Sequence, residues 1–64
     1  MENKLKYYRE KVGLTQQELA QKATVSRNTI SSLETQNNFN VTYEVMNKIA
    51  GALGYTVPTI FFSK

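Results

Sequence analysis

The sequence has no cysteine and no histidine among its 64 residues, and these absences exclude several classes of protein. Without cysteine the chain can form neither disulfides nor thiolate metal sites. Without histidine it lacks the commonest metal ligand and the commonest general acid or base at neutral pH. The carboxylates and lysines that remain are scattered and form no paired constellation. We therefore expect no enzymatic activity, no metal site and no cofactor.

Long apolar runs are also absent, and none approaches the roughly 20 residues that a membrane-spanning helix requires. Residues 1–10 carry several charged side chains and do not resemble a secretory signal. These features predict a cytoplasmic protein without a membrane partner. The length predicts one domain over residues 1–64, close to the size at which a single core only marginally supports folding. The formal net charge of +3 favours an anionic partner, although many basic domains of this size bind nothing acidic.

Signals for helix starts and ends divide the chain into short segments. Residues 5–12 have apolar positions at helical spacing, and Gly13 supplies the backbone freedom that ends a helix. Thr15 and Glu18 then have the T-x-x-E spacing of a capping box, in which each side chain accepts the backbone N–H of the other residue. This pattern predicts a second helix over residues 16–23.

A third helix is predicted after a very short connection. Ser26 is a good N-cap and predicts a helix over residues 27–34. Because the connection is so short, the two helices must cross at a steep angle, and Ala20 provides a small side chain where they pack. These features predict a helix-turn-helix over about residues 16–35.

The rest of the sequence predicts two more helices. Residues 35–40 are rich in turn-forming side chains. Thr42 can cap a fourth helix that Gly54 ends, and Thr56 can cap a last short turn. Together these signals predict an all-α fold, a compact arrangement of five helices without a sheet.

Three separate blocks of sequence resemble one protein family. Residues 14–20 read LTQQELA, residues 25–34 read VSRNTISSLE, and residues 48–54 read KIAGALG. This pattern resembles the lambda-repressor-like family of helix-turn-helix proteins, also called the Cro/CI or XRE type, over about residues 5–61. The resemblance implies a compact five-helix domain that docks its third helix in the major groove of double-stranded DNA.

The resemblance also implies roles for individual residues. Arg27, Asn28 and Ser32 fall where the family reads base edges. Arg27 suits guanine O6 and N7, and Asn28 suits adenine N6 and N7. Arg9 and Glu34 occupy positions that relatives often join in a structural ion pair. The residues expected to contact phosphates are Gln16, Ser26, Thr29, Ser31, Asn37 and Asn38.

The sequence departs from the family pattern in two places. Thr24 stands where many relatives have glycine, at a position that often requires a positive φ and disfavours a β-branched residue. Residues 35–40 lack the lysine or arginine that relatives commonly place on phosphates. We therefore expect a strained or reshaped turn, modest DNA affinity per subunit and a weaker salt dependence than in more basic relatives.

The C-terminal residues include large apolar side chains that are hard to bury completely on a last short turn. An exposed apolar patch of this kind usually marks an interface, and relatives often dimerise through the fifth helix. We expect a two-fold homodimer that places two recognition helices about 34 Å apart on a palindromic site. The residues expected at its interface are Val57, Ile60, Phe61 and Phe62.

Three functions are compatible with these features. The first is a sequence-specific transcriptional regulator, and specifically a repressor that occupies an operator. The second is an antitoxin that represses its own operon and neutralises a toxin, which would be its protein partner. The third is a protein-interaction adaptor that has kept the fold and lost DNA binding. An adaptor would be expected to carry an apolar patch on the third helix in place of Arg27 and Asn28.

Overall fold

Five helices make up the described part of the chain, residues 3–35 and 41–62 of a computed structural model, and that part contains no strand. The helices are α1 (Leu5–Val12), α2 (Gln16–Ala23), α3 (Arg27–Thr35), α4 (Tyr43–Leu53) and α5 (Val57–Phe61). The prediction of an all-α fold is confirmed, and α3 ends at Thr35, just beyond its predicted end. None of these helices has the length and apolarity needed to span a bilayer.

Side-chain caps begin α2, α3, α4 and α5 at the positions that the sequence predicts. Thr15 Oγ1 accepts a hydrogen bond from the backbone N–H of Glu18 at 3.0 Å, and Glu18 Oε1 accepts one from the N–H of Thr15 at 2.8 Å. This reciprocal pair is the predicted capping box. Three further hydroxyl groups accept the backbone N–H three residues later and cap α3, α4 and α5: those of Ser26, Thr42 and Thr56.

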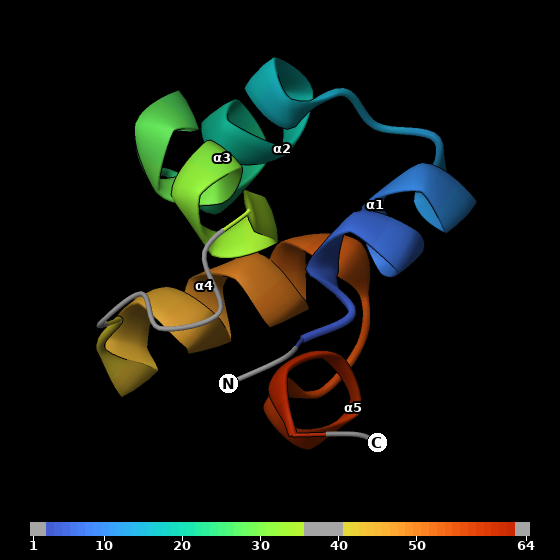
Figure 1. Ribbon diagram of the computed structural model, residues 1–64, viewed down its shortest axis with the longest axis vertical. Coiled ribbons are helices and arrows are strands. Elements are labelled where there is room, and N and C mark those ends of the chain that lie inside the picture. The colour runs from blue at the N-terminus through green and yellow to red at the C-terminus, as the bar shows by residue number, and fades with distance from the viewer. Residues whose placement is uncertain (1–2, 36–40, 63–64) are drawn as a thin grey trace.

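The helix α4 lies at the centre of the fold. It contacts α1, α2 and α5, and Figure 1 shows it between the α2–α3 pair and α5. The start of α1 is tied to α5, because the backbone N–H of Lys4 donates to the carbonyl of Ile60 at 2.8 Å. The pair α2–α3 therefore rests on a frame made by the other helices.

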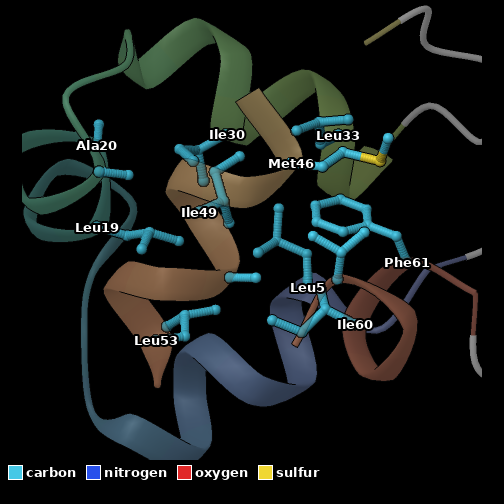
Figure 2. Packing of buried hydrophobic residues seen from close by; sticks show 13 residues of the cluster. Leu5, Leu19, Ala20, Ile30, Leu33, Met46, Ile49, Leu53, Ile60 and Phe61 are labelled. Carbon is cyan, nitrogen blue, oxygen red and sulfur yellow. The ribbon is translucent and has the colours of Figure 1, made fainter. Parts of the chain in front are cut away.

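All five helices contribute side chains to one apolar core. Figure 2 shows Leu5 of α1, Ile49 of α4 and Phe61 of α5 extending into the space between the helices. Because the chain has no disulfide, this core and the helix caps must supply its stability. The largest fully buried side chains are those of Leu5, Leu19, Ile30, Leu33, Ile49, Ile60 and Phe61.

The packing of α5 contradicts one expectation. Val57, Ile60 and Phe61 are 3%, 0% and 0% exposed, so these residues belong to the core and cannot form the expected dimer surface. A helix of 5 residues is too short for apolar periodicity to separate a buried face from an exposed one. Of the four residues predicted at the interface, only Phe62, at 55% exposed, is open to solvent.

Candidate nucleic-acid interface

A tight turn at Thr24 joins α2 to α3. Thr24 has a left-handed backbone, with φ of 61° and ψ of 44°, and it is the one non-glycine residue in the described ranges with a positive φ. The N–H of Val25 donates to the carbonyl of Ala20 at 3.0 Å, which closes the end of α2. The turn is therefore left-handed at a β-branched residue, as the departure from glycine led us to expect.

The helix α3 presents an apolar side to the core and a polar side to solvent. Ile30 and Leu33 are buried against the other helices. Arg27 and Asn28 are exposed at the start of the helix, and Ser32 is half-buried. Since a helix has about 3.6 residues per turn, Asn28 and Ser32 lie one turn apart on the side opposite to the buried residues. The residues predicted to read bases therefore share the outer part of α3.

Hydroxyl groups lie beside this outer part. Ser26 Oγ accepts the N–H of Thr29 at 3.1 Å and lies 2.9 Å from Thr29 Oγ1, so the two hydroxyls share a hydrogen bond. Because each hydroxyl has one proton, one O–H of the pair remains for an external acceptor. Ser31, two residues after Thr29 on the same helix, is half-buried. These three side chains, which the resemblance places on phosphates, lie on the same helix as Arg27 and Asn28 or at its cap.

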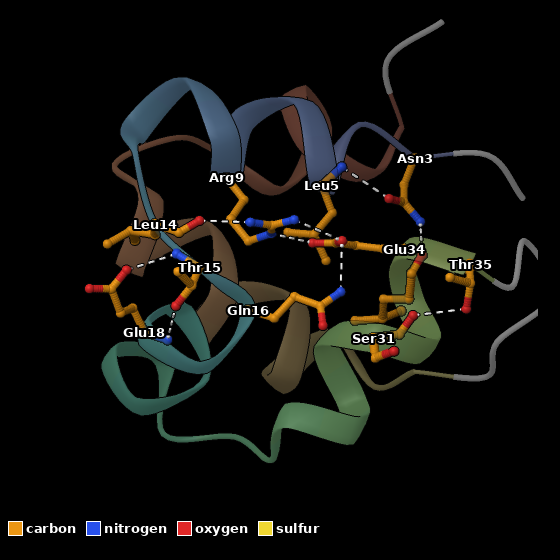
Figure 3. Close-up of polar contacts among 11 residues, drawn as sticks. Asn3, Leu5, Arg9, Leu14, Thr15, Gln16, Glu18, Ser31, Glu34 and Thr35 are labelled. Atoms are coloured by element: carbon orange, nitrogen blue, oxygen red, sulfur yellow. Dashed lines mark hydrogen bonds and ion pairs between the residues drawn. The ribbon is translucent and has the colours of Figure 1, made fainter.

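A buried ion pair joins α1 to the last turn of α3 (Figure 3). Arg9 Nε donates to Glu34 Oε2 at 2.6 Å and Arg9 Nη2 donates to Glu34 Oε1 at 3.2 Å, with the two side chains 11% and 3% exposed. Arg9 Nη1 also donates to the carbonyl of Leu14 at 2.7 Å. The hydrogen bond with Glu34 raises the pKa of Arg9, burial acts in the opposite direction, and the charges of Glu34 and Glu10 add to the rise. The two residues paired by the resemblance are thus in contact.

Gln16, the first residue of α2, belongs to the same network. Its Nε2 donates to Glu34 Oε1 at 3.1 Å. Figure 3 shows the amide nitrogen directed toward Glu34 and the amide oxygen pointing away. One N–H of the amide is therefore used inside the protein, and the other remains for a second acceptor. No pattern in the sequence indicates this bond, because the two residues are 18 positions apart and meet only in the folded chain.

Asn3 is a structural residue that the sequence analysis missed. Its Nδ2 donates to the carbonyl of Leu33 at 2.9 Å, and its Oδ1 accepts the N–H of Leu5 at 3.0 Å. It therefore accepts the first backbone N–H of α1 and connects α1 to α3. The tendency of an asparagine side chain to accept the backbone N–H two residues later was the available signal. The predicted phosphate contacts Asn37 and Asn38 lie outside the described residues.

Positive charge near α3 is sparse. Arg27 is the one cationic residue within α3, and the carboxylate of Glu34 is paired with Arg9. Across the ranges 3–35 and 41–62 no group of three acidic, histidine or cysteine side chains could hold a metal ion. The chemistry of this surface is therefore hydrogen bonding from hydroxyl and amide groups together with a single guanidinium.

Comparison with known proteins agrees with this geometry. The profile of the helix-turn-helix family matches residues 5–60. An uncharacterized HTH-type transcriptional regulator from Methanocaldococcus jannaschii is 43% identical over 61 residues, which are 95% of this chain and 91% of that protein. Both matches span the two helices joined at Thr24 and the frame that supports them. The chain therefore belongs to the helix-turn-helix family, in its lambda-repressor-like or XRE-type form.

Proposed function

We propose that this protein is a sequence-specific DNA-binding transcriptional regulator that inserts α3 into the major groove of double-stranded DNA. The outer part of α3 carries the proposal, because Arg27 and Asn28 are exposed there while the other side of the helix is fixed in the core. A helix with its side chains is about 10–12 Å wide, and the major groove of B-DNA is about 12 Å wide. The relative's name, an HTH-type transcriptional regulator, belongs to the same class.

Each polar residue of this surface has a role in the proposal. The guanidinium of Arg27 donates two hydrogen bonds to guanine O6 and N7, and the amide of Asn28 pairs with adenine N6 and N7. Ser32 contacts a third base one turn further along α3. Contacts to phosphates fix the position of the helix without reading sequence. They come from Gln16, Ser26, Thr29, Ser31, Asn37 and Asn38.

The regulator acts in this proposal as a repressor, and as a two-fold dimer on a palindromic operator. A single copy offers one short helix and little positive charge, so a second copy is needed for tight binding. With Val57, Ile60 and Phe61 buried, Phe62 is the one residue of the predicted interface that remains open to a partner subunit. Occupancy of the operator then blocks the polymerase.

Selection of bound duplexes from a random pool tests the base-reading role of α3. Wild type is expected to enrich a palindrome. Arg27→Ala is expected to relax the preference at one position in each half-site, at a cost of about 1–3 kcal/mol for the preferred base. Lys6→Ala is the matched control, because it removes the same charge from an exposed position on α1. It should weaken binding slightly and leave the enriched sequence unchanged.

Two results would count against this function. If wild type enriches no sequence even at low salt, the adaptor that has lost DNA binding becomes the better account. If Arg27→Ala and Lys6→Ala change the enriched sequences equally, α3 is not the reading element. Co-purification of a toxin bound to the free protein would favour the antitoxin form of the same regulator.

A further inference from the structure

The carboxylate of Glu34 lies where three helices meet. It belongs to the last turn of α3, accepts from Arg9 of α1 through both of its oxygens, and accepts from Gln16 of α2 through Oε1. Its side chain is almost fully buried, so water does not compete freely for these bonds. Glu34 therefore fixes the first residue of α2 relative to the end of α3.

The bond to Glu34 also restricts the amide of Gln16 to one orientation. A free glutamine side chain must order several rotatable bonds before its amide can bind an acceptor, and that ordering weakens binding. In this protein Nε2 is already held 3.1 Å from Glu34, with the side chain half-buried. Its second N–H therefore has a fixed direction before any ligand arrives.

Arg9 makes this arrangement compatible with an anionic ligand. A lone carboxylate next to a phosphate would repel it, and burial would strengthen the repulsion. Arg9 contacts both oxygens of Glu34, at 2.6 and 3.2 Å, so the pair carries no net charge. Gln16 can then approach a phosphate without opposition from the group that orients it.

We propose that Glu34 and Arg9 are positioning residues for DNA binding, and that they act through Gln16 by directing its free amide N–H at a backbone phosphate. This inference rests on the proposed function. It gives the ion pair a role beyond stabilising the fold, because the pair then determines how tightly the start of α2 holds the DNA backbone.

A double-mutant cycle between Gln16 and Glu34 tests the inference. Gln16→Met keeps the length of the side chain, removes its donors and leaves the ion pair in place. Glu34→Gln keeps the shape and removes the charge. Wild type, both single variants and the double variant are compared by fluorescence anisotropy on the duplex that wild type enriches. Both the binding measurement and a circular dichroism spectrum are taken at one low temperature, and the spectrum establishes that each variant is folded. Gln21→Met, the same change at an exposed position of α2, is the control.

The expected result is a coupling between the two residues in DNA affinity. Gln16→Met should weaken binding about tenfold and Glu34→Gln about fivefold, the range of one ordinary hydrogen bond. In the Gln16→Met background Glu34→Gln should weaken it by less than about twofold, and Gln21→Met should change it by less than about twofold. If Glu34→Gln does not fold, Arg9→Lys replaces it in the cycle, since lysine keeps the charge and loses the bidentate contact with Glu34.

Other outcomes separate the inference from the function on which it rests. Equal effects of Glu34→Gln in both backgrounds would overturn the inference and leave the function intact, because the ion pair would then act on stability alone. An unchanged affinity in Gln16→Met would overturn it as well. If wild type binds no duplex, the proposed function fails, and the inference fails with it.

Discussion

Thr24 occupies a backbone conformation that its side chain disfavours. Its φ of 61° and ψ of 44° lie in the left-handed region, which costs a residue with a Cβ atom roughly 1–2 kcal/mol. Glycine avoids that cost but loses more conformational entropy on folding, roughly 0.5–1 kcal/mol. We therefore expect Thr24→Gly to raise the free energy of unfolding by about 0.5–1 kcal/mol. Thermal unfolding followed by circular dichroism should show a Tm higher by roughly 4 °C.

Two variants control this comparison. Thr24→Ala keeps a Cβ atom and should leave the free energy of unfolding within about 0.5 kcal/mol of wild type. Gly54→Ala places a Cβ atom at a φ of 81° and should lower it by about 1 kcal/mol. A Thr24→Gly protein no more stable than wild type would mean that the turn is not strained.

Arg9 is expected to contribute more stability than any exposed charge in the described residues. Removing one partner of a buried pair leaves the other uncompensated, so Arg9→Met should lower the free energy of unfolding by about 3 kcal/mol. Urea denaturation at low temperature measures this loss. Lys48→Met is the control, because the contact of Lys48 with Glu44 is 3.7 Å and exposed, and its removal should cost less than about 0.5 kcal/mol.

The pH dependence of the Arg9 contribution follows from the direction of its pKa shift. Glu34 raises the pKa of Arg9 in the folded state. The stability gained is fully present below the unfolded pKa and is lost only as the pH rises through the folded pKa. Arginine is charged in the unfolded chain up to a pH of about 12. Arg9 therefore stays charged in both states over this range, and its titration adds no pH dependence. The difference in the free energy of unfolding between wild type and Arg9→Met that comes from this charge should be the same at about pH 6 and about pH 9.

Residue-scale predictions from the sequence succeeded where a local pattern or the family resemblance specified the position. The spacing of Thr15 and Glu18 predicted a capping box, and the structure contains it. The resemblance placed Arg9 against Glu34, and the two are in contact. The bonds of Gln16 to Glu34 and of Asn3 to Leu33 had no such signal, because each depends on a rotamer and on a meeting of distant segments.

The start of α2 illustrates how an element depends on its first residues. The helix has 8 residues, too few to form by propensity alone, so its cap and its packing must stabilise it. We expect Thr15→Ala to lower the free energy of unfolding by about 1 kcal/mol, because the N–H of Glu18 loses its acceptor. Chemical denaturation measures the change. Thr15→Ser keeps the hydroxyl and should stay within about 0.5 kcal/mol of wild type, and an equal loss in both variants would argue against the capping bond.

Helix positions could be predicted from the sequence, whereas the faces of the shortest helix could not. Caps are local, so Ser26, Thr42 and Thr56 located the starts of three helices. The end of α3 differed slightly because the hydroxyl of Thr35 donates to the carbonyl of Ser31, which keeps Thr35 in the helix. For α5 the burial of Ile60 and its neighbours depends on how α1 and α4 pack against it, and no pattern within α5 encodes that packing.

At the scale of the whole molecule, two adjacent phenylalanines have different roles: Phe61 stabilises the fold, and Phe62 is open to a partner subunit. Phe61 is fully buried among residues of the core, whereas Phe62 is mostly exposed. A domain of this size has about 3–10 kcal/mol of stability, and Phe61→Ala should remove about 3–5 kcal/mol of it. We therefore expect Phe61→Ala to be largely unfolded by circular dichroism at room temperature. Phe62→Ala should retain the helical signal and a Tm close to that of wild type.

Phe62→Ala also tests the proposed dimer, because Phe62 can contribute to assembly without contributing to the core. If two copies meet at the end of α5, Phe62→Ala should shift sedimentation toward monomer at micromolar concentration. It should also reduce affinity for the full palindrome more than for a single half-site, since avidity is lost while each α3 still reads its bases. Equal losses on both duplexes, with unchanged sedimentation, would exclude this interface. The α3 surface would then have to bind its operator as a monomer or through a different contact between subunits.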